Sequence, residues 1–162
     1  MANTKHLEIL RRTMATAPQQ LNVEQWQQWY EGTEWYQWRK QHPRLRPNLS
    51  GADLSGLALL IIDFSSTNLT GTNLSGSSLW NLEGANLTNA NLTDADLVEA
   101  TLNNANLTRA NLTGADLELA FLHEADLTEA NFTDACLLNA ELWGANVDDT
   151  NFTGANLDGV EY

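Results

Sequence analysis

The sequence predicts an elongated solenoid preceded by a short helical segment. From residue 47 to residue 162 the chain is built of five-residue units of the form Ala-Asn/Asp-Leu-Thr/Ser-x. The alanine two places before the central hydrophobe recurs without exception from Ala85 to Ala145. Neither an amphipathic helix, with a period of 3.6 residues, nor an alternating strand, with a period of 2, repeats every five residues. The chain is therefore expected to turn a corner in every unit.

The central hydrophobes of the units, called centres below, fall into two runs. They recur every five residues from Leu49 to Leu79, the next centre is Leu82, and the register then holds to Leu157. This gives seven units, a phase slip at Trp80-Asn81, and sixteen more units. The large centre is expected to point inward. The alanine beside it lets neighbouring walls approach, so close packing would reject a larger side chain there.

The stretch GANLTNANLTDADLVEATLNNANLTRANLTGADL resembles the pentapeptide-repeat family, and the resemblance extends over residues 47–162. It implies an all-β fold, a right-handed quadrilateral β-helix. Four units, or twenty residues, would make one coil, so the chain would contain just under six coils. On that geometry Phe132 and Phe152 lie one coil apart and are expected to stack.

Residues 1–46 differ in composition and are predicted to form three short helices. Asn3 or Thr4 would cap the first helix, on which three residues share a face: Leu7, Leu10 and Met14. The second would lie around Trp26, Trp29 and Tyr30 and end at Gly32. Thr33 would cap the third, which contains Trp35 and Trp38 and ends before Pro43.

The segment EGTEWYQWRKQHPRLRPNLSGADLSG also resembles a leader common in cyanobacterial members of the family. That leader has a Trp-x-x-Trp-Arg turn followed by two prolines and the first repeat. The predicted domains are a helical N-terminal cap, residues 1–46, and a pentapeptide-repeat β-helix, residues 47–162. The end of a solenoid exposes unpaired backbone and core side chains, so a covering segment is expected there.

The net charge of −13 is unevenly distributed. Residues 1–46 contain seven of the eight lysines and arginines against four glutamates, whereas residues 47–162 contain only Arg109 against seventeen acids. This acidic excess disfavours direct binding to nucleic acid and leaves open basic protein partners or mimicry of nucleic acid. The acids spread over all four predicted faces, which favours a generally solvated surface over a double row that imitates a duplex.

No catalytic, cofactor-binding or metal site is predicted. His6, His42 and His123 are far apart and lack the spacing of metal ligands, and Cys136 has no second cysteine. His123 and Glu124 are adjacent, so their side chains are expected to point apart. The chain shows neither a signal peptide nor 18 consecutive apolar residues, so we expect a cytoplasmic protein that does not enter membranes.

The position just after each centre is expected to face outward and is usually Thr or Ser. Apolar residues break this rule at Leu60, Trp80, Val98, Leu138 and Trp143. With four units per coil, the first four fall on one face, Leu119 and Phe121 lie on its corner, and Trp143 lies just beyond. The candidate protein-binding edge therefore consists of Leu60, Trp80, Leu119, Phe121, Leu138 and Trp143.

Large exposed apolar patches usually mark contact surfaces. Three alternatives stay open: the N-terminal helices cover this edge, the edge binds another protein or a second copy in a weak homodimer, or the apolar residues are scattered at random. The predicted function is a non-catalytic scaffold or protein–protein interaction module. The alternative is an acidic DNA mimic that binds a type II topoisomerase, as some pentapeptide-repeat proteins do. The short rod and the helical leader depart from those proteins.

Overall fold

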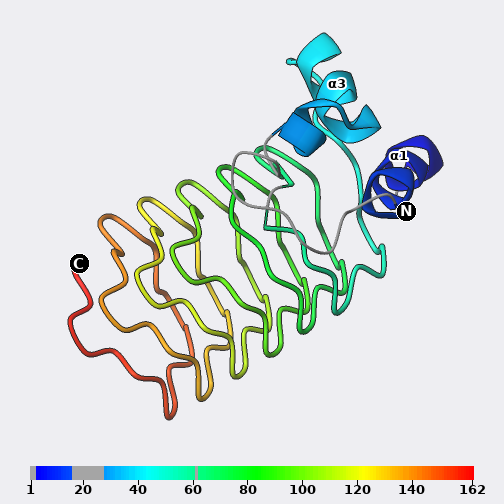
Figure 1. The fold of residues 1–162 in the computed structure, drawn as a ribbon. Helices are drawn as coiled ribbons and strands as arrows, with labels where there is room; N and C mark the ends of the chain where they lie inside the picture. The colour runs from blue at the N-terminus through cyan, green and yellow to red at the C-terminus, as the bar shows by residue number, and fades with distance from the viewer. Residues whose placement is uncertain (1–2, 16–27, 61) are drawn as a thin grey trace.

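The structure, a computed structural model, describes residues 3–15, 28–60 and 62–162. Helices α1 (Thr4–Ala15) and α3 (Glu34–Gln41) lie together at one end, and residues 28–31 are also helical. The rest of the chain winds away from them as a stack of coils that ends at the C-terminus (Figure 1). The predicted first and third helices are thus confirmed. Trp26, assigned to the second predicted helix, lies outside the described residues.

The helix caps follow from local hydrogen bonds. Asn3 is the cap of α1, because its side-chain Oδ1 accepts a bond from Lys5 N at 3.0 Å and its carbonyl accepts one from Leu7 N at 3.1 Å. Thr33 caps α3 as predicted, since its hydroxyl oxygen accepts from Tyr36 N at 3.3 Å.

Parallel bridges join each coil to the next along four ladders, numbered here in chain order. The first ladder contains Asn48, Asn68, Asn86, Asn106, Asp126 and Asn146, and the second contains Asp53, Asn73, Asn91, Asn111, Asn131 and Asn151. The third contains Ala58, Ser78, Asp96, Asp116, Cys136 and Asn156, and the fourth contains Asp63, Asn81, Thr101, Phe121, Glu141 and Glu161. Four bridged positions per circuit agree with a coil of four units.

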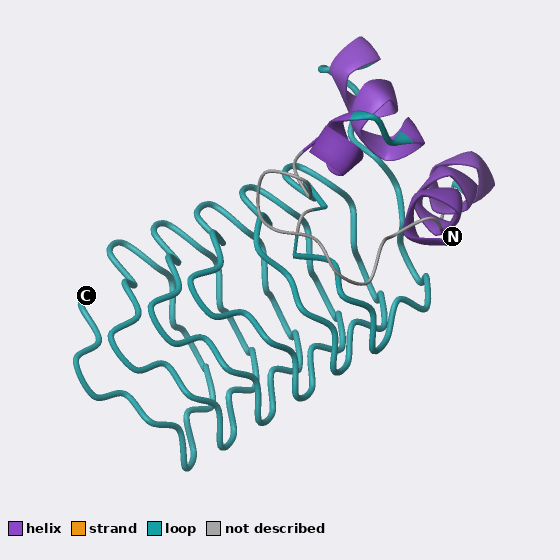
Figure 2. Ribbon diagram, viewed as in Figure 1, coloured by secondary structure: helices purple, strands orange, loops and turns teal. Residues whose placement is uncertain are grey.

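The ladders consist of isolated bridges, and no strand longer than one bridged residue forms in the described coils, which Figure 2 draws as loops. The prediction of an all-β fold therefore needs a correction in detail. In each unit the bridged residue is followed by the centre. The backbone N–H of the centre donates to the bridged residue of the next coil, as Leu87 N does to Asn106 O at 2.7 Å. The next residues form a turn, in which Ala90 N donates to Leu87 O at 2.9 Å and Asn89 has a φ of 56°. The turn occupies the residues that would extend a strand.

The phase slip produces one short coil. Bridges that cross it join residues 18 apart, as in Asp63–Asn81 and Ser78–Asp96, whereas the other bridges join residues 20 apart. The unit between Leu79 and Leu82 is two residues shorter than the others, but it still counts as one unit. The four ladders therefore stay aligned through the slip.

The interior is filled by the centres and the alanine column. Centres from Leu49 to Leu142 are at most 2% exposed, and each alanine from Ala85 to Ala140 is at most 1% exposed. The rings of Phe132 and Phe152 stack as predicted, with centroids 5.3 Å apart and planes at 26°. Val147 is a centre and was expected to be buried, but its exposed fraction is 39%. It lies in the last coil, and no later described coil covers it.

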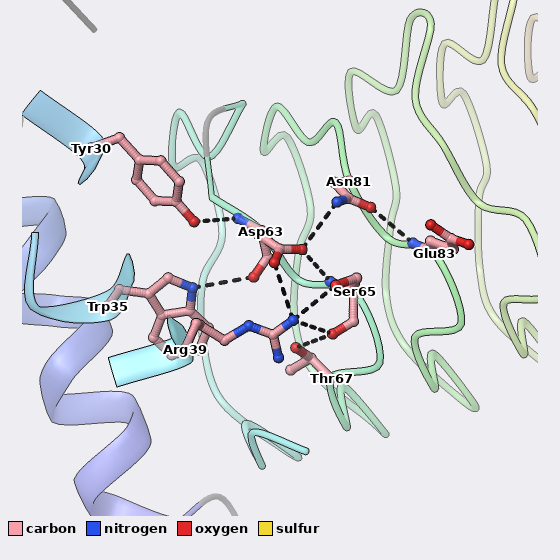
Figure 3. A network of polar contacts seen from close by, with 8 residues as sticks. All are labelled: Tyr30, Trp35, Arg39, Asp63, Ser65, Thr67, Asn81 and Glu83. Atoms are coloured by element: carbon pink, nitrogen blue, oxygen red, sulfur yellow. Dashed lines mark hydrogen bonds and ion pairs between the residues drawn. The ribbon is translucent and has the colours of Figure 1, made fainter. Parts of the chain in front are cut away.

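The first coil pairs its backbone with the N-terminal segment instead of a preceding coil. At the first ladder, Asn48 N donates to His6 Nδ1 at 2.9 Å, and Asn48 O accepts from Asn3 N at 2.9 Å. At the fourth ladder, Asp63 N donates to the Tyr30 hydroxyl at 3.0 Å, and Asp63 O accepts from Trp35 Nε1 at 3.2 Å (Figure 3). Two of the four ladders thus have both backbone groups of their first residue satisfied.

Apolar packing and one charged side chain reinforce these contacts. Trp35 is fully buried, and its ring meets the first-coil centre Phe64 edge-on at 5.9 Å. Arg39 Nη2 reaches Asp63 Oδ2 at 3.1 Å and also donates to Ser65 O and Oγ (Figure 3). Burial raises the pKa of Tyr30 to about 12, so its hydroxyl stays protonated at neutral pH while it accepts from Asp63 N.

The contact made by His6 is expected to weaken in acid. Burial lowers the pKa of His6 from its ordinary value of about 6.5, and its Nδ1 can accept from Asn48 N only while unprotonated. The contribution is complete above about pH 6.5. It falls at lower pH, because the unfolded chain takes up the proton first. We expect the stability difference between the wild-type protein and His6→Ala to shrink between about pH 7.5 and about pH 5 in chemical denaturation. A constant difference would contradict this assignment.

Candidate protein-binding edge

Four apolar residues follow the third ladder, each at the same position of its coil. Each stands two places after a bridged residue, and the column reads Leu60, Trp80, Val98, Glu118, Leu138 and Asp158. Leu60 is 47% exposed and Trp80 56% exposed, while Val98 and Leu138 are half-buried. In the first and second ladders the equivalent position is occupied by Ser, Thr or, once, Asp. The apolar residues are therefore specific to this side of the solenoid.

Trp80 faces outward because of the short coil. Thr101 N donates to Trp80 O at 2.8 Å, whereas one coil later Phe121 N donates to Ala100 O at 2.9 Å. The backbone of Trp80 thus occupies the place that a buried alanine has in the next coil. An indole is too large for that interior position, and the side chain lies in solvent.

Leu119 and Phe121 extend the edge around the corner between the third and fourth ladders. Leu119 is 41% exposed, and its N–H donates to Leu138 O in the next coil at 2.9 Å. Its φ of 59° places it in the left-handed region, where it is the only apolar residue among the described non-glycine residues. A bulky side chain is uncommon in this conformation. The coil turn itself does not require leucine, since Asn139 holds the equivalent position one coil later with a φ of 55°.

Phe121 and Trp143 form the end of the edge along the fourth ladder, and His123 lies beside them. Phe121 is 36% exposed and meets the His123 ring edge-on at 6.2 Å, while Trp143 is 51% exposed. His123 Nε2 lies 2.7 Å from Glu141 Oε2 in the next coil. Sequence reasoning considered Glu124 as the neighbour of His123 and missed Glu141. The 18-residue separation was the available signal, because it joins a residue after one centre to the bridged residue of the next coil.

The six predicted edge residues extend over two neighbouring ladders: Leu60, Trp80 and Leu138 follow the third, Leu119 and Phe121 lie between the third and the fourth, and Trp143 follows the fourth. Five of the six are exposed, and Leu138 is half-buried. The contacts described above between α1 or α3 and the coils are made to Asn48, Asp63, Phe64 and Ser65. Within the described ranges, no group of three His, Cys, Asp or Glu residues is placed to hold a metal ion. No described helix has the length and apolar character that a membrane crossing requires.

The repeat pattern and the four ladders agree with the comparison to known families. The model for pentapeptide repeats matches residues 48–79, 81–118, 105–140 and 135–161, in eight copies. The chain belongs to the pentapeptide-repeat family, and its coils form a solenoid joined by parallel bridges. No curated protein matches the chain.

Several solved structures are similar. Rfr23, a pentapeptide repeat protein from the cyanobacterium Cyanothece 51142, is 34% identical over 59% of this chain and 63% of its own, with a TM-score of 0.49. A pentapeptide repeat protein from the Arabidopsis thaliana thylakoid lumen is 35% identical over 66% of each chain, with a TM-score of 0.21. HetL from the cyanobacterium Nostoc is 22% identical over 75% of this chain and 92% of its own, with a TM-score of 0.22. The chain spans less than two thirds of the length of the first two.

Proposed function

We propose that this protein is a non-catalytic protein-interaction module and that its apolar edge is the contact surface. The observation that supports the proposal is the exposure of large apolar side chains at positions where the same fold uses Thr, Ser or Asn elsewhere. The interior does not need them, since the centres and alanines already fill it. Exposed aromatic residues grouped with aliphatic ones are typical of binding surfaces.

We further infer that residues 1–46 act as an end cap of the solenoid. The support comes from the pairing of first-coil backbone groups with His6, Asn3, Tyr30 and Trp35. A solenoid end that lacks such partners leaves backbone groups and core side chains open to association. In this proposal the helices stabilise the rod, and the edge along its side binds the partner.

Charge mimicry of nucleic acid has less support. The acids belong to all four ladders, with Asp126, Asp134, Asp116 and Glu141 on or beside the first, second, third and fourth respectively. Mimicry of a duplex requires acids in aligned rows on one surface. A gyrase supercoiling assay separates the two functions: inhibition that persists in a Trp143→Thr variant would favour the mimic over an interaction through the edge.

Trp143→Thr is expected to weaken partner binding by about 1 kcal/mol or more and to leave the melting temperature nearly unchanged. The measurement is quantitative capture of proteins from a native lysate by the wild type, by Trp143→Thr and by the control Thr113→Ala beside the second ladder. A partner lost only with Trp143→Thr supports the proposal. If the N-terminal segment covers the edge instead, the same change would lower stability by about 2 kcal/mol or more. If neither property changes, the edge has no role.

Leu119→Asn gives an independent prediction at the corner of the edge. Asn adopts the left-handed region more readily than Leu and occupies the equivalent corner as Asn139. We expect stability to be unchanged or higher by up to about 1 kcal/mol, together with weaker partner binding. Denaturation and capture on the same variant test both expectations. A clear loss of stability would show that Leu119 serves the fold.

A further inference from the structure

Acidic side chains flank the apolar edge along its length. The acids on or just after the third ladder are Asp96, Glu99, Asp116, Glu118 and Asp158. Glu99 N donates to Glu118 O at 2.8 Å, so these two residues lie side by side in neighbouring coils, and Glu118 stands between Val98 and Leu138 in their column. Asp96 and Asp116 each accept only one backbone bond through Oδ1, at 3.3 and 3.1 Å. Their second carboxylate oxygens remain free for a ligand.

The cations of this chain do not neutralise these acids in the described structure. Arg109, the only arginine or lysine after residue 46, lies just after the first ladder and forms a two-bond pair with Glu129 at 2.8 and 2.9 Å. Arg39 is engaged by Asp63 and Ser65 at the first coil. His123 lies beside the edge, but its Nε2 is held by Glu141. The edge thus combines exposed apolar groups with uncompensated negative charge.

We propose that the occupant of the edge is a basic amphipathic segment of another protein, with apolar side chains that contact the edge and lysines or arginines that contact its acids. This inference rests on the proposed function and specifies the partner's chemistry. Opposite charges across an interface favour encounter and select the partner, whereas like charges brought together are costly. A second copy of this chain would bring the same acids to the contact, so the charges disfavour edge-to-edge self-association.

The aromatic residues of the edge suit the same partner. Trp80 and Trp143 are each more than half exposed, so an indole face is open to an arginine or lysine. Cations bind favourably over indole faces, most strongly over tryptophan. Phe121 is bridged to Glu141 in the next coil, and Trp143 follows Glu141 by two residues, so aromatic and acidic residues are neighbours along this part of the edge.

The test uses the full-length protein and two synthetic helical peptides. Both peptides have leucine on one face, and the other face has lysine in one peptide and glutamate in the other. We expect the lysine peptide to bind at least about tenfold more tightly, with an affinity that falls as salt is raised. Trp143→Thr should weaken its binding about fivefold or more. The double variant Glu99→Gln, Glu118→Gln should weaken it and reduce the salt dependence.

The matched control is Asp149→Asn, which removes one exposed acid beside the first ladder, away from the edge. Three results would overturn the proposal: equal affinity for the two peptides, equal losses for Asp149→Asn and for either edge glutamate changed alone, or a Trp143-dependent dimer in sedimentation. The proposed function is judged separately. A captured partner that requires Trp143 but is acidic, or binds equally well at high salt, would leave the interaction module intact and reject only the basic partner.

Discussion

Trp35→Ala is expected to lower the stability of the N-terminal end of the rod by about 3–5 kcal/mol. Trp35 is fully buried, packs on Phe64 and donates to Asp63 O, so its loss removes core volume and leaves a backbone acceptor unpaired. In a solenoid each coil contacts only its neighbours, so the damage should stay near the first coil. Hydrogen exchange should show lost protection at Leu49 and Phe64, with little change at Leu112.

The matched control is Trp143→Ala, the same substitution at a side chain that is 51% exposed. It should cost less than about 1 kcal/mol. Equal losses of stability for the two variants would contradict both the capping role of Trp35 and the assignment of Trp143 to a free surface. Uniform loss of protection along the whole rod in Trp35→Ala would show that the rod unfolds as one unit.

Ala115→Leu is expected to destabilise the coils by about 1–3 kcal/mol or more. Ala115 is fully buried, its N–H closes the turn on Leu112 O at 3.0 Å, and neighbouring walls leave no room for three more carbons. Thr113→Leu adds the same residue at an outward position that Leu138 occupies in another unit, and it should cost less than about 1 kcal/mol. Chemical denaturation of both variants decides the matter. Equal midpoints for Ala115→Leu and the wild type would reject the inward assignment.

Sequence periodicity predicted the solenoid because every unit repeats the same local interactions. The inward centres, the buried alanines and the Phe132–Phe152 stack follow from counting in fives and twenties. The candidate edge was assigned from the same count, and its role as a binding surface stays a prediction. The caps of α1 and α3 were predictable because Asn3 and Thr33 act within a few residues of themselves.

Interactions outside the repeat could not be predicted in this way. The pairing of His6, Tyr30 and Trp35 with the first coil depends on how the helices are oriented against the rod, and no periodicity records that orientation. The coils contain isolated bridges and not strands, because each unit turns after its centre and closes that turn with a backbone hydrogen bond. The strand propensity of the residues does not reveal this turn. The partner of His123 is found only by counting 18 residues forward, to the bridged residue of the next coil.

The repeat register also determines which insertions and deletions leave the residues of the edge on the same side of the solenoid. A block of twenty residues can be gained or lost and leaves every later side chain on its original side, whereas a block of five turns the remainder of the rod by a quarter. A five-residue deletion between Val98 and Leu119 would preserve each unit and still carry Leu138 and Trp143 away from Trp80. The unit at Trp80 is two residues short, but it is still present as a unit, so the later side chains keep their ladders. Divergence among rods of this kind is therefore expected to proceed by whole coils wherever a surface shared by several coils is under selection.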